Sequence, residues 1–597
     1  MKLACAFLIA ILPASAAAQR VTVDYALAVD SADLSGYAVE MRIHHAPDTL
    51  RLAMAAHPEY DERFRRQVRD LRAEGRSGAA AVVREDSAVW RIVAPGGEVT
   101  VRYRIELPPP ADGARPSWVP FLAPTGGLVG GPHSFMYLLG DEDAASTVAL
   151  RLPAGWDAAT GMEPAAAANA WRATKFAEVM DGPILVGRLR RWRFAVDGVP
   201  HDVVYWPLPG AAPFDTTALV DALRKIVEQS RSVFGALPYR RFAFLLRDGA
   251  YGGLEHATST TLGAPSAELA GDRSDFLLSA AHEYFHTWNL VRLRPAGWGG
   301  LSHRPPARTR ELWWSEGVTM YFADLVLRRA GLLPDAPSRL EALREQLSRY
   351  LDDPGFARIS PERASWTADD PPGADGDYRG DHYLQGQLLA AALELVVRDS
   401  TGGRRGMDDV MRTMYARHAG PAGFAGADVE RTASSVCGCS LHRFFGRHVR
   451  AAELLDFDAY LRPLGLRARM ALEPVRGPAG EPLPDLRVWS YLPPGEPHLA
   501  LIITDARGTW ARAGLHTGDR VVALDGVPIG DTRAFRTTVR ALRVGSRVRV
   551  DVLRAGHPVR ADVEIGSYSR RAVTLTDLPA VSPRQRQMRQ RWLDATP

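Results

Sequence analysis

Apolar and polar residues alternate along most of the first third of the chain. This period-two pattern, interrupted by turn residues, predicts strands with one buried face. It recurs in five segments, at 21–29, 37–45, 87–94, 98–107 and 146–153. We therefore expect residues 19–195 to form an N-terminal β-sandwich-like domain. The exception is 59–75, whose pattern predicts a short amphipathic helix.

A helical period replaces the alternation after residue 196. Residues 215–235 predict an amphipathic helix that begins at an Asp215 N-cap and ends at Gly235. A strand over 240–248 and a glycine-rich segment follow, and helical periodicity then continues to about residue 466. The chain is therefore predicted to be a multidomain α+β protein.

The C-terminal part of the chain returns to a strand period. Its apolar runs lie within 471–566, which we expect to form a separate β-rich module. Residues 567–597 are polar and basic, and this tail is expected to be poorly ordered.

The first twenty residues, MKLACAFLIAILPASAAAQR, differ in composition from the rest. Lys2, an apolar stretch and a small-residue site predict a signal peptide over 1–18. A membrane anchor is the alternative, but the apolar stretch is shorter than the ~18 residues that span a bilayer. We expect an exported protein, periplasmic or secreted, without a membrane span after cleavage.

The net charge adds little to the functional prediction. The net charge of +4 over 597 residues is small, and the basic residues form no clustered patch. No nucleic-acid partner is expected. Only Cys437 and Cys439 remain after removal of the predicted signal peptide. Their separation by one residue leaves open a bridge, a metal site together with His442 and His448, or a local structural role.

The first candidate metal-binding motif lies in AAHEYFHTWNLVRLRP, residues 280–295. On a helix that continues to Pro295, His282 and His286 lie one turn apart on the same face, which suits two imidazole ligands of one ion. Glu283 lies beside them, where it could accept a proton from water. The alternative is that all three are ordinary helix residues.

A catalytic zinc normally takes a third protein ligand. Glu316 lies in the apolar segment ELWWSEGVTMYF, where an unpaired carboxylate is costly. His303 in the intervening loop is a competing ligand, although we expect its side chain to be exposed.

These motifs resemble the glycyl aminopeptidase family, whose members are gluzincin zinc peptidases that often carry a PDZ module. The resemblance rests on HEYFHTWN and LWWSEGVTMYF, which lie thirty positions apart (286 to 316). It implies a thermolysin-like α/β catalytic domain at 196–335 with its helical part at 336–470. It also implies one Zn²⁺ ion, held by His282, His286 and Glu316.

The same resemblance implies roles for residues around the metal. Gly252 and Gly253 would let an extended peptide approach, and Glu255 would bind its free α-amino group. Glu283 would act as the general base. Tyr383 would stabilise the oxyanion, with Tyr378 as a second candidate; Gln385 replaces the lysine of the family's tyrosine motif.

The segment ARAGLHTGDRVVALDGVPI resembles the core of a PDZ domain, with a possible peptide ligand. Together, the motifs and the resemblance predict a zinc aminopeptidase. It would act on peptides with a free N-terminus and a small first residue, glycine or alanine. Two alternatives stay open: a zinc endopeptidase, in which Glu255 is not needed, and a catalytically inactive peptide-binding PDZ adaptor.

Overall fold

The structure is a computed structural model that describes residues 20–56, 64–109, 114–299, 301–304, 307–333 and 336–595. The predicted signal peptide, 1–18, lies outside these residues. The chain divides into two compact units, which are described separately: one within 1–113, 119–189 and 300–306, the other within 114–118, 190–299 and 307–597. Among the described helices, none has the length and apolar character that crossing a bilayer requires.

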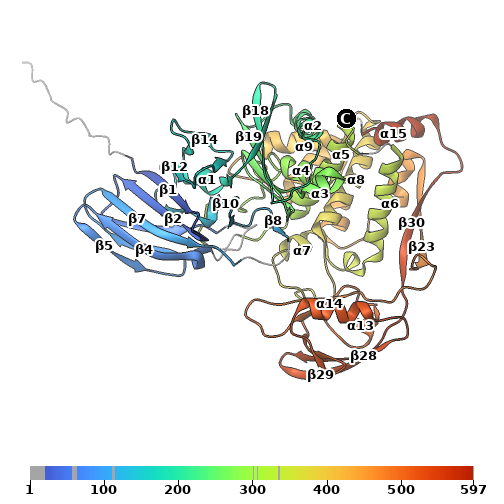
Figure 1. Cartoon of the computed structure of the whole chain (residues 1–597). Coiled ribbons are helices and arrows are strands. Elements are labelled where there is room, and N and C mark those ends of the chain that lie inside the picture. The colour runs from blue at the N-terminus through green and yellow to red at the C-terminus, as the bar shows by residue number, and fades with distance from the viewer. Residues whose placement is uncertain are drawn as a thin grey trace, which may run out of the picture. The chain divides into compact units, whose positions relative to one another are not determined.

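The first unit is built from two sheets (Figure 1). The larger sheet has eleven strands, in the order β11 (Met136–Leu138), β3 (Thr49–Met54), β6 (Val89–Val93), β5 (Gly78–Arg84), β4 (Val68–Gly75), β7 (Glu98–Glu106), β2 (Asp33–His44), β1 (Thr22–Asp30), β12 (Ala145–Arg151), β15 (Ala170–Ala173) and β14 (Glu163–Pro164). The smaller sheet has the order β13 (Asp157–Ala159), β16 (Pro183–Gly187), β10 (Gly126–Gly130) and β9 (Phe121–Ala123).

One hydrophobic core holds this unit together. Alternate residues of β1, Val23, Tyr25, Leu27 and Val29, are buried in it, as period-two patterning requires. Residues of both sheets, of α1 (Phe176–Met180) and of the short turn η1 (Phe64–Gln67) belong to the same core. His133 of the turn η2 (Gly131–His133) lies against Phe64, with ring centroids 4.4 Å apart. The expected β-rich N-terminal fold is confirmed.

The helix predicted over 59–75 is wrong in its described part. Residues 57–63 lie outside the described structure, and η1 is followed by strand β4, which pairs with β7 and β5. The register shifts between Arg69 and Arg72, and Asp70 has a φ of 53°. This bulge breaks the alternation of β4, so the strand pattern is hidden in the sequence.

The second unit begins with a five-stranded sheet. Its order is β17 (Arg190–Val196), β18 (Val199–Trp206), β19 (Phe242–Arg247), β22 (Ser259–Gly263) and β21 (Gly253–Glu255). β18, β19 and β22 are parallel, and every residue of β19 is buried, as expected for a strand covered on both faces. The two-residue strands β8 (Arg115–Pro116) and β20 (Ala250–Tyr251) pair beside this sheet.

Helices cover the sheet and build most of the core (Figure 1). α2 (Thr216–Phe234) begins at Asp215, whose carboxylate accepts from Ala218 N, and ends at Gly235 with a φ of 91°, as predicted. The others are α3 (Ser266–Ala270), α4 (Ser274–Phe285), η3 (Trp313–Val318), α5 (Thr319–Arg329), α6 (Ala336–Asp352), η4 (Pro354–Ala357), α7 (Pro361–Trp366), α8 (His382–Thr401), α9 (Met407–His418), α10 (Gly426–Cys437), α11 (His442–Phe445), η5 (Gly446–Arg450), α12 (Phe457–Leu461) and η6 (Arg462–Leu464).

A disulfide joins Cys437 at the end of α10 to Cys439, with their Cα atoms 5.1 Å apart. Gly438 lies between them in the left-handed conformation that ends the helix. The bridge therefore fixes a helix terminus, and its two sulfur atoms are not available as metal ligands.

The PDZ-like module has a hydrophobic core of its own. Its strands and helices are β24 (Val488–Tyr491), β25 (Ala500–Ile503), α13 (Thr509–Arg512), β26 (Arg520–Leu524), β27 (Val527–Pro528), α14 (Thr532–Ala541), β28 (Arg547–Arg554) and β29 (His557–Glu564). β24 lies at one edge of the sheet, and α14 packs near it. The separate module expected from the returning strand period is therefore present.

The prediction of a poorly ordered tail is wrong. Residues after the module form β30 (Ser569–Asp577), which pairs with β23 (Leu466–Pro474) along α6, and helix α15 (Pro583–Leu593) (Figure 1). Met588 and Trp592 are buried, and the Arg339 guanidinium lies 4.3 Å from the Trp592 ring centroid. These few apolar anchors outweigh the polar composition on which the prediction rested.

Candidate metal centre and peptide site

Two histidines at the end of α4 form the base of the candidate site: His282 lies in its last turn, and His286 directly follows the helix. His282 and His286 are both buried, and their imidazole rings meet edge to face with centroids 4.5 Å apart. Their Nε2 atoms lie 2.9 Å from each other. The side chains therefore converge on one point, as the one-turn spacing predicts.

The helix that carries them ends earlier than predicted, at Phe285 rather than at Pro295. Leu290 has a φ of 117°, which no helix accommodates. Asn289 is fully buried, and its carbonyl oxygen lies 2.8 Å from His286 Nδ1. The break therefore supplies the hydrogen bond that orients the second histidine, a contact that is common behind metal-binding imidazoles.

Glu316 comes from η3, a π-helical turn that runs directly into α5. The Asn289 side-chain amide lies 3.2 Å from the carbonyl oxygens of both Trp314 and Ser315, and 3.0 Å from Thr319 Oγ1. Thr319 Oγ1 also donates to the Ser315 carbonyl oxygen at 2.6 Å, so two side chains supply partners to the backbone of this turn. Single π-turns of this kind are frequent at functional sites.

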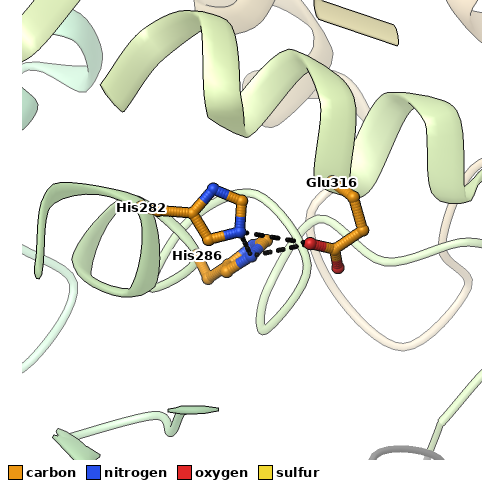
Figure 2. Close-up of side chains that lie close together, drawn as sticks. All are labelled: His282, His286 and Glu316. Carbon is orange, nitrogen blue, oxygen red and sulfur yellow. Dashed lines mark hydrogen bonds and ion pairs between the residues drawn. The ribbon is translucent and has the colours of Figure 1, made fainter. Parts of the chain in front are cut away.

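The three side chains meet as Figure 2 shows. Glu316 Oε2 lies 3.2 Å from His282 Nε2 and 3.3 Å from His286 Nε2. Ligands at 2.0–2.1 Å from a tetrahedral zinc ion are separated from one another by about 3.3 Å. The three ligand atoms thus have a spacing that fits one zinc ion, and the donor set of two imidazoles and one carboxylate suits it.

The side chains of this cluster shift one another's pKa. Burial alone would raise the pKa of Glu316, but the imidazoles of His286 and His282 outweigh it and hold that pKa well below its usual range. Burial would likewise lower the pKa of His286, and the carboxylate of Glu316 reverses the effect and raises it. The pocket therefore favours a buried negative charge facing positive charge, which is the electrostatic pattern of a cation site.

Glu283 lies on the neighbouring side of α4 and is partly buried. Burial is the main cause that raises the pKa of its carboxyl group, and the nearby imidazoles only partly oppose it. A Cβ atom added to Gly253 would lie 2.8 Å from Glu283 Cδ and 2.9 Å from Oε1. The carboxylate is thus held against a backbone that only glycine leaves open, which gives Gly253 a role that its predicted contact with a peptide did not include.

Gly253 begins β21, the edge strand of the five-stranded sheet. Only β22 pairs with β21 among the described strands, so its other edge can take an added strand. Glu255 at the end of β21 lies with Glu283 and His286 in a cluster whose ligand atoms are all within 4.8 Å of one another. Gly252 precedes the strand with a φ of 68° and is exposed.

Tyr383 lies in the first turn of α8, where the Asp381 side chain accepts from its backbone N–H at 3.0 Å. Its side chain is 42% exposed, and its ring centroid is 6.1 Å from that of His282. Tyr378 lies instead under the Arg358 guanidinium, 5.5 Å from the ring centroid. Of the two candidate tyrosines, Tyr383 is the one with a ring contact to a metal-ligand candidate.

Two glycines let α8 lie directly on the π-turn. A Cβ added to Gly386 would lie 2.8 Å from Gly317 Cα, and one added to Gly317 would lie 2.7 Å from the carbonyl oxygens of His382 and Tyr383. The backbone contact sets the distance between Tyr383 and the metal cluster. Gly386 belongs to the tyrosine motif and can therefore be found in the sequence. For Gly317, which follows Glu316, the sequence predicts no role.

His303, the competing ligand, is half-buried rather than exposed. It belongs to the first unit, where its Nδ1 atom lies 3.4 Å from Tyr137 Oη. The described histidines and carboxylates that could hold a metal form only the two clusters named above, and His303 is in neither.

The chain is similar to known families in three regions. The model of the M61 glycyl aminopeptidase matches residues 275–389, the model of the peptidase M61 N-terminal domain matches 24–188, and the model of a PDZ domain matches 502–565. No curated protein matches the chain.

One solved structure extends the likeness to the whole fold. An aminopeptidase N family protein from Idiomarina loihiensis is 22% identical, with a TM-score of 0.78, over 96% of this chain and 100% of that chain. An M1 zinc metallopeptidase from Deinococcus radiodurans is 16% identical, with a TM-score of 0.44, over 70% of this chain and 92% of that chain. The first of these shares the overall fold.

Proposed function

Since this chain belongs to the M61 glycyl aminopeptidase family and is therefore a metallopeptidase, we propose that it binds one zinc ion and removes glycine or alanine from peptide N-termini. One observation carries the proposal. Two imidazole nitrogens and a carboxylate oxygen meet within 3.3 Å of one another, next to a second carboxylate and an edge strand. The family's description supports the preference for a small first residue.

His282, His286 and Glu316 would hold the ion. Zinc in such a site supplies a Lewis acid that polarises the scissile carbonyl and makes water acidic enough to lose a proton near neutral pH. Asn289 orients His286 through its carbonyl oxygen and so fixes which ring nitrogen faces the site.

Glu283 accepts the proton of the attacking water and delivers it to the leaving amine. Its raised pKa places this carboxyl group nearer the operating pH than an exposed glutamate, which suits a group that takes up and releases a proton in one cycle. Gly253 holds the acceptor oxygen in place.

Glu255 binds the α-amino group, because an ammonium and a partly buried carboxylate form a charge-assisted hydrogen bond. Since Glu255 lies within reach of Glu283, only the first peptide bond lies at the base. Tyr383 donates its hydroxyl hydrogen to the oxygen that gains negative charge during attack.

The test of this scheme compares glycyl anilide with its N-acetylated form. The purified protein should cleave the first and not the second, and Glu255→Gln should lose most of the activity on the free amine without losing zinc. Equal cleavage of both substrates would identify an endopeptidase instead. Binding without any cleavage by a zinc-loaded protein would point to the adaptor.

We extend the proposal to location and to the PDZ module. The predicted signal peptide and the Cys437–Cys439 disulfide support export into an oxidising compartment. In the module, β24 is an edge strand on which Trp489 is 57% exposed, so a peptide ligand could pair with it. Arg487 is engaged by Asp485 and Asp505, which favours pairing with an internal segment over capture of a terminal carboxylate.

A further inference from the structure

Residues 114–118 belong to the second unit, which contains the candidate site. The 71 residues that follow them, 119–189, belong to the first unit. β8 pairs in parallel with β20, Ser117 N donates to Tyr251 O at 2.9 Å, and Ser117 Oγ lies 3.2 Å from Thr261 O. Arg247 Nη1 donates to Pro116 O at 3.1 Å. The segment is thus fastened to the strand that leads into the glycine-rich segment.

This attachment places Trp118 against Gly252. A Cβ added to Gly252 would lie 3.0 Å from Trp118 Cζ3 and 3.5 Å from Cη2. Gly252 is exposed and Trp118 is partly buried, so the indole covers this backbone without closing it off. Tyr251 beside it is 54% exposed. An aromatic wall therefore stands next to the start of β21.

The direction of a bound peptide follows from two contacts of β21. Glu255 is the proposed clamp for the α-amino group, and Glu283, the proposed base, lies against Gly253. The scissile bond must lie near the base, so the peptide runs from Glu255 toward Gly253, antiparallel to β21. The residue after the scissile bond then lies beside Gly252, because successive residues of an extended chain advance by about 3.3 Å.

We propose that Trp118 forms a wall of the subsite for the second residue of the peptide. The enzyme then favours peptides with a small first residue and an apolar or aromatic second residue. This inference rests on the proposed function, since it takes the amine clamp and the base as given.

The expected size of the effect follows from the chemistry of an indole wall. A benzyl or isobutyl side chain that packs on the wall loses water from its apolar surface, and an aromatic one also gains ring–ring attraction. A hydroxymethyl side chain gains little of either. Removing the indole should therefore lower kcat/KM for a glycyl-phenylalanine amide about tenfold more than for a glycyl-serine amide.

The experiment measures kcat/KM for glycyl-phenylalanine amide and glycyl-serine amide with the wild type, Trp118→Ala and Trp118→Phe. The ratio of the two values should fall about tenfold in Trp118→Ala and be largely retained in Trp118→Phe. Trp192→Ala is the matched control and should leave the ratio unchanged, because its partly buried indole lies on β17, at the opposite edge of the five-stranded sheet from β21. Equal losses on both substrates in Trp118→Ala would overturn the proposal.

The same two peptides, titrated by calorimetry into zinc-loaded Glu283→Gln with and without Trp118→Ala, separate this inference from the proposed function. Tighter binding of the phenylalanine peptide that disappears in the double variant supports the wall even if the wild type does not turn over. Binding of the two peptides with equal affinity in Glu283→Gln would refute the wall, while free-amine-dependent cleavage by the wild type would still support an aminopeptidase.

Discussion

Gly253→Ala tests how closely the base must be held. The new methyl group would overlap Glu283 Cγ and lie 2.8 Å from Glu283 Cδ, whereas ordinary carbon–carbon contacts are about 3.5–4.0 Å. The carboxylate must therefore move by about 1 Å, a displacement that can cost about 100-fold in rate. Gly253 has no positive φ that would strain an alanine, so the loss should come from the base and not from unfolding.

The assay compares kcat, KM, zinc content and thermal stability of the wild type, Gly253→Ala and Glu283→Gln on glycyl anilide. We expect kcat to fall about 100-fold in Gly253→Ala, with zinc retained and stability nearly unchanged. Gly530→Ala is the matched control, because a Cβ there meets no atom within 4 Å and its φ is not positive. Wild-type kcat in Gly253→Ala would refute the proposed position of the base.

Three further predictions address the tyrosine, the packing of α8 and a buried histidine. Tyr383→Phe should lower kcat by about 100-fold at unchanged zinc content, whereas Tyr378→Phe should lower it less than threefold or so; equal losses would contradict the assignment. Gly386→Ala should lower the free energy of unfolding in urea by about 1–3 kcal/mol, because α8 must move away from the Trp313 carbonyl group and from Gly317; unchanged stability would contradict the close contact. Burial lowers the pKa of His201 to about 4 from 6.5, so the unfolded chain takes up a proton between these values that the folded protein does not. The free energy of unfolding should therefore fall by up to about 3 kcal/mol as the pH drops from 6.5 to 4, and His201→Gln should remove this part of the slope in urea titrations; an unchanged slope would contradict the assignment.

The convergence of His282, His286 and Glu316 could be predicted from the sequence because its signals are local. The positions of His282 and His286 put them on one helical face, and an isolated Glu316 among apolar residues demands a partner. The structure brings all three together. The end of the helix could not be predicted, since it depends on Asn289 reaching a turn that is distant in sequence.

Long-range contacts account for what the sequence did not indicate. Trp118 lies at the proposed peptide site because its segment pairs with β20, and no pattern in 114–118 predicts this pairing. The tail is ordered because Trp592 meets Arg339, about 250 positions earlier. In both cases the deciding contacts join segments that are far apart in the sequence, so no local pattern predicts them.

The measurement that tests the central claim most directly is anomalous X-ray scattering at the zinc absorption edge from crystals of the purified protein. We predict one anomalous peak per chain, at a zinc ion bound by His282 Nε2, His286 Nε2 and the Glu316 carboxylate. A protein crystallised with added zinc that shows no peak between these three side chains would contradict the account.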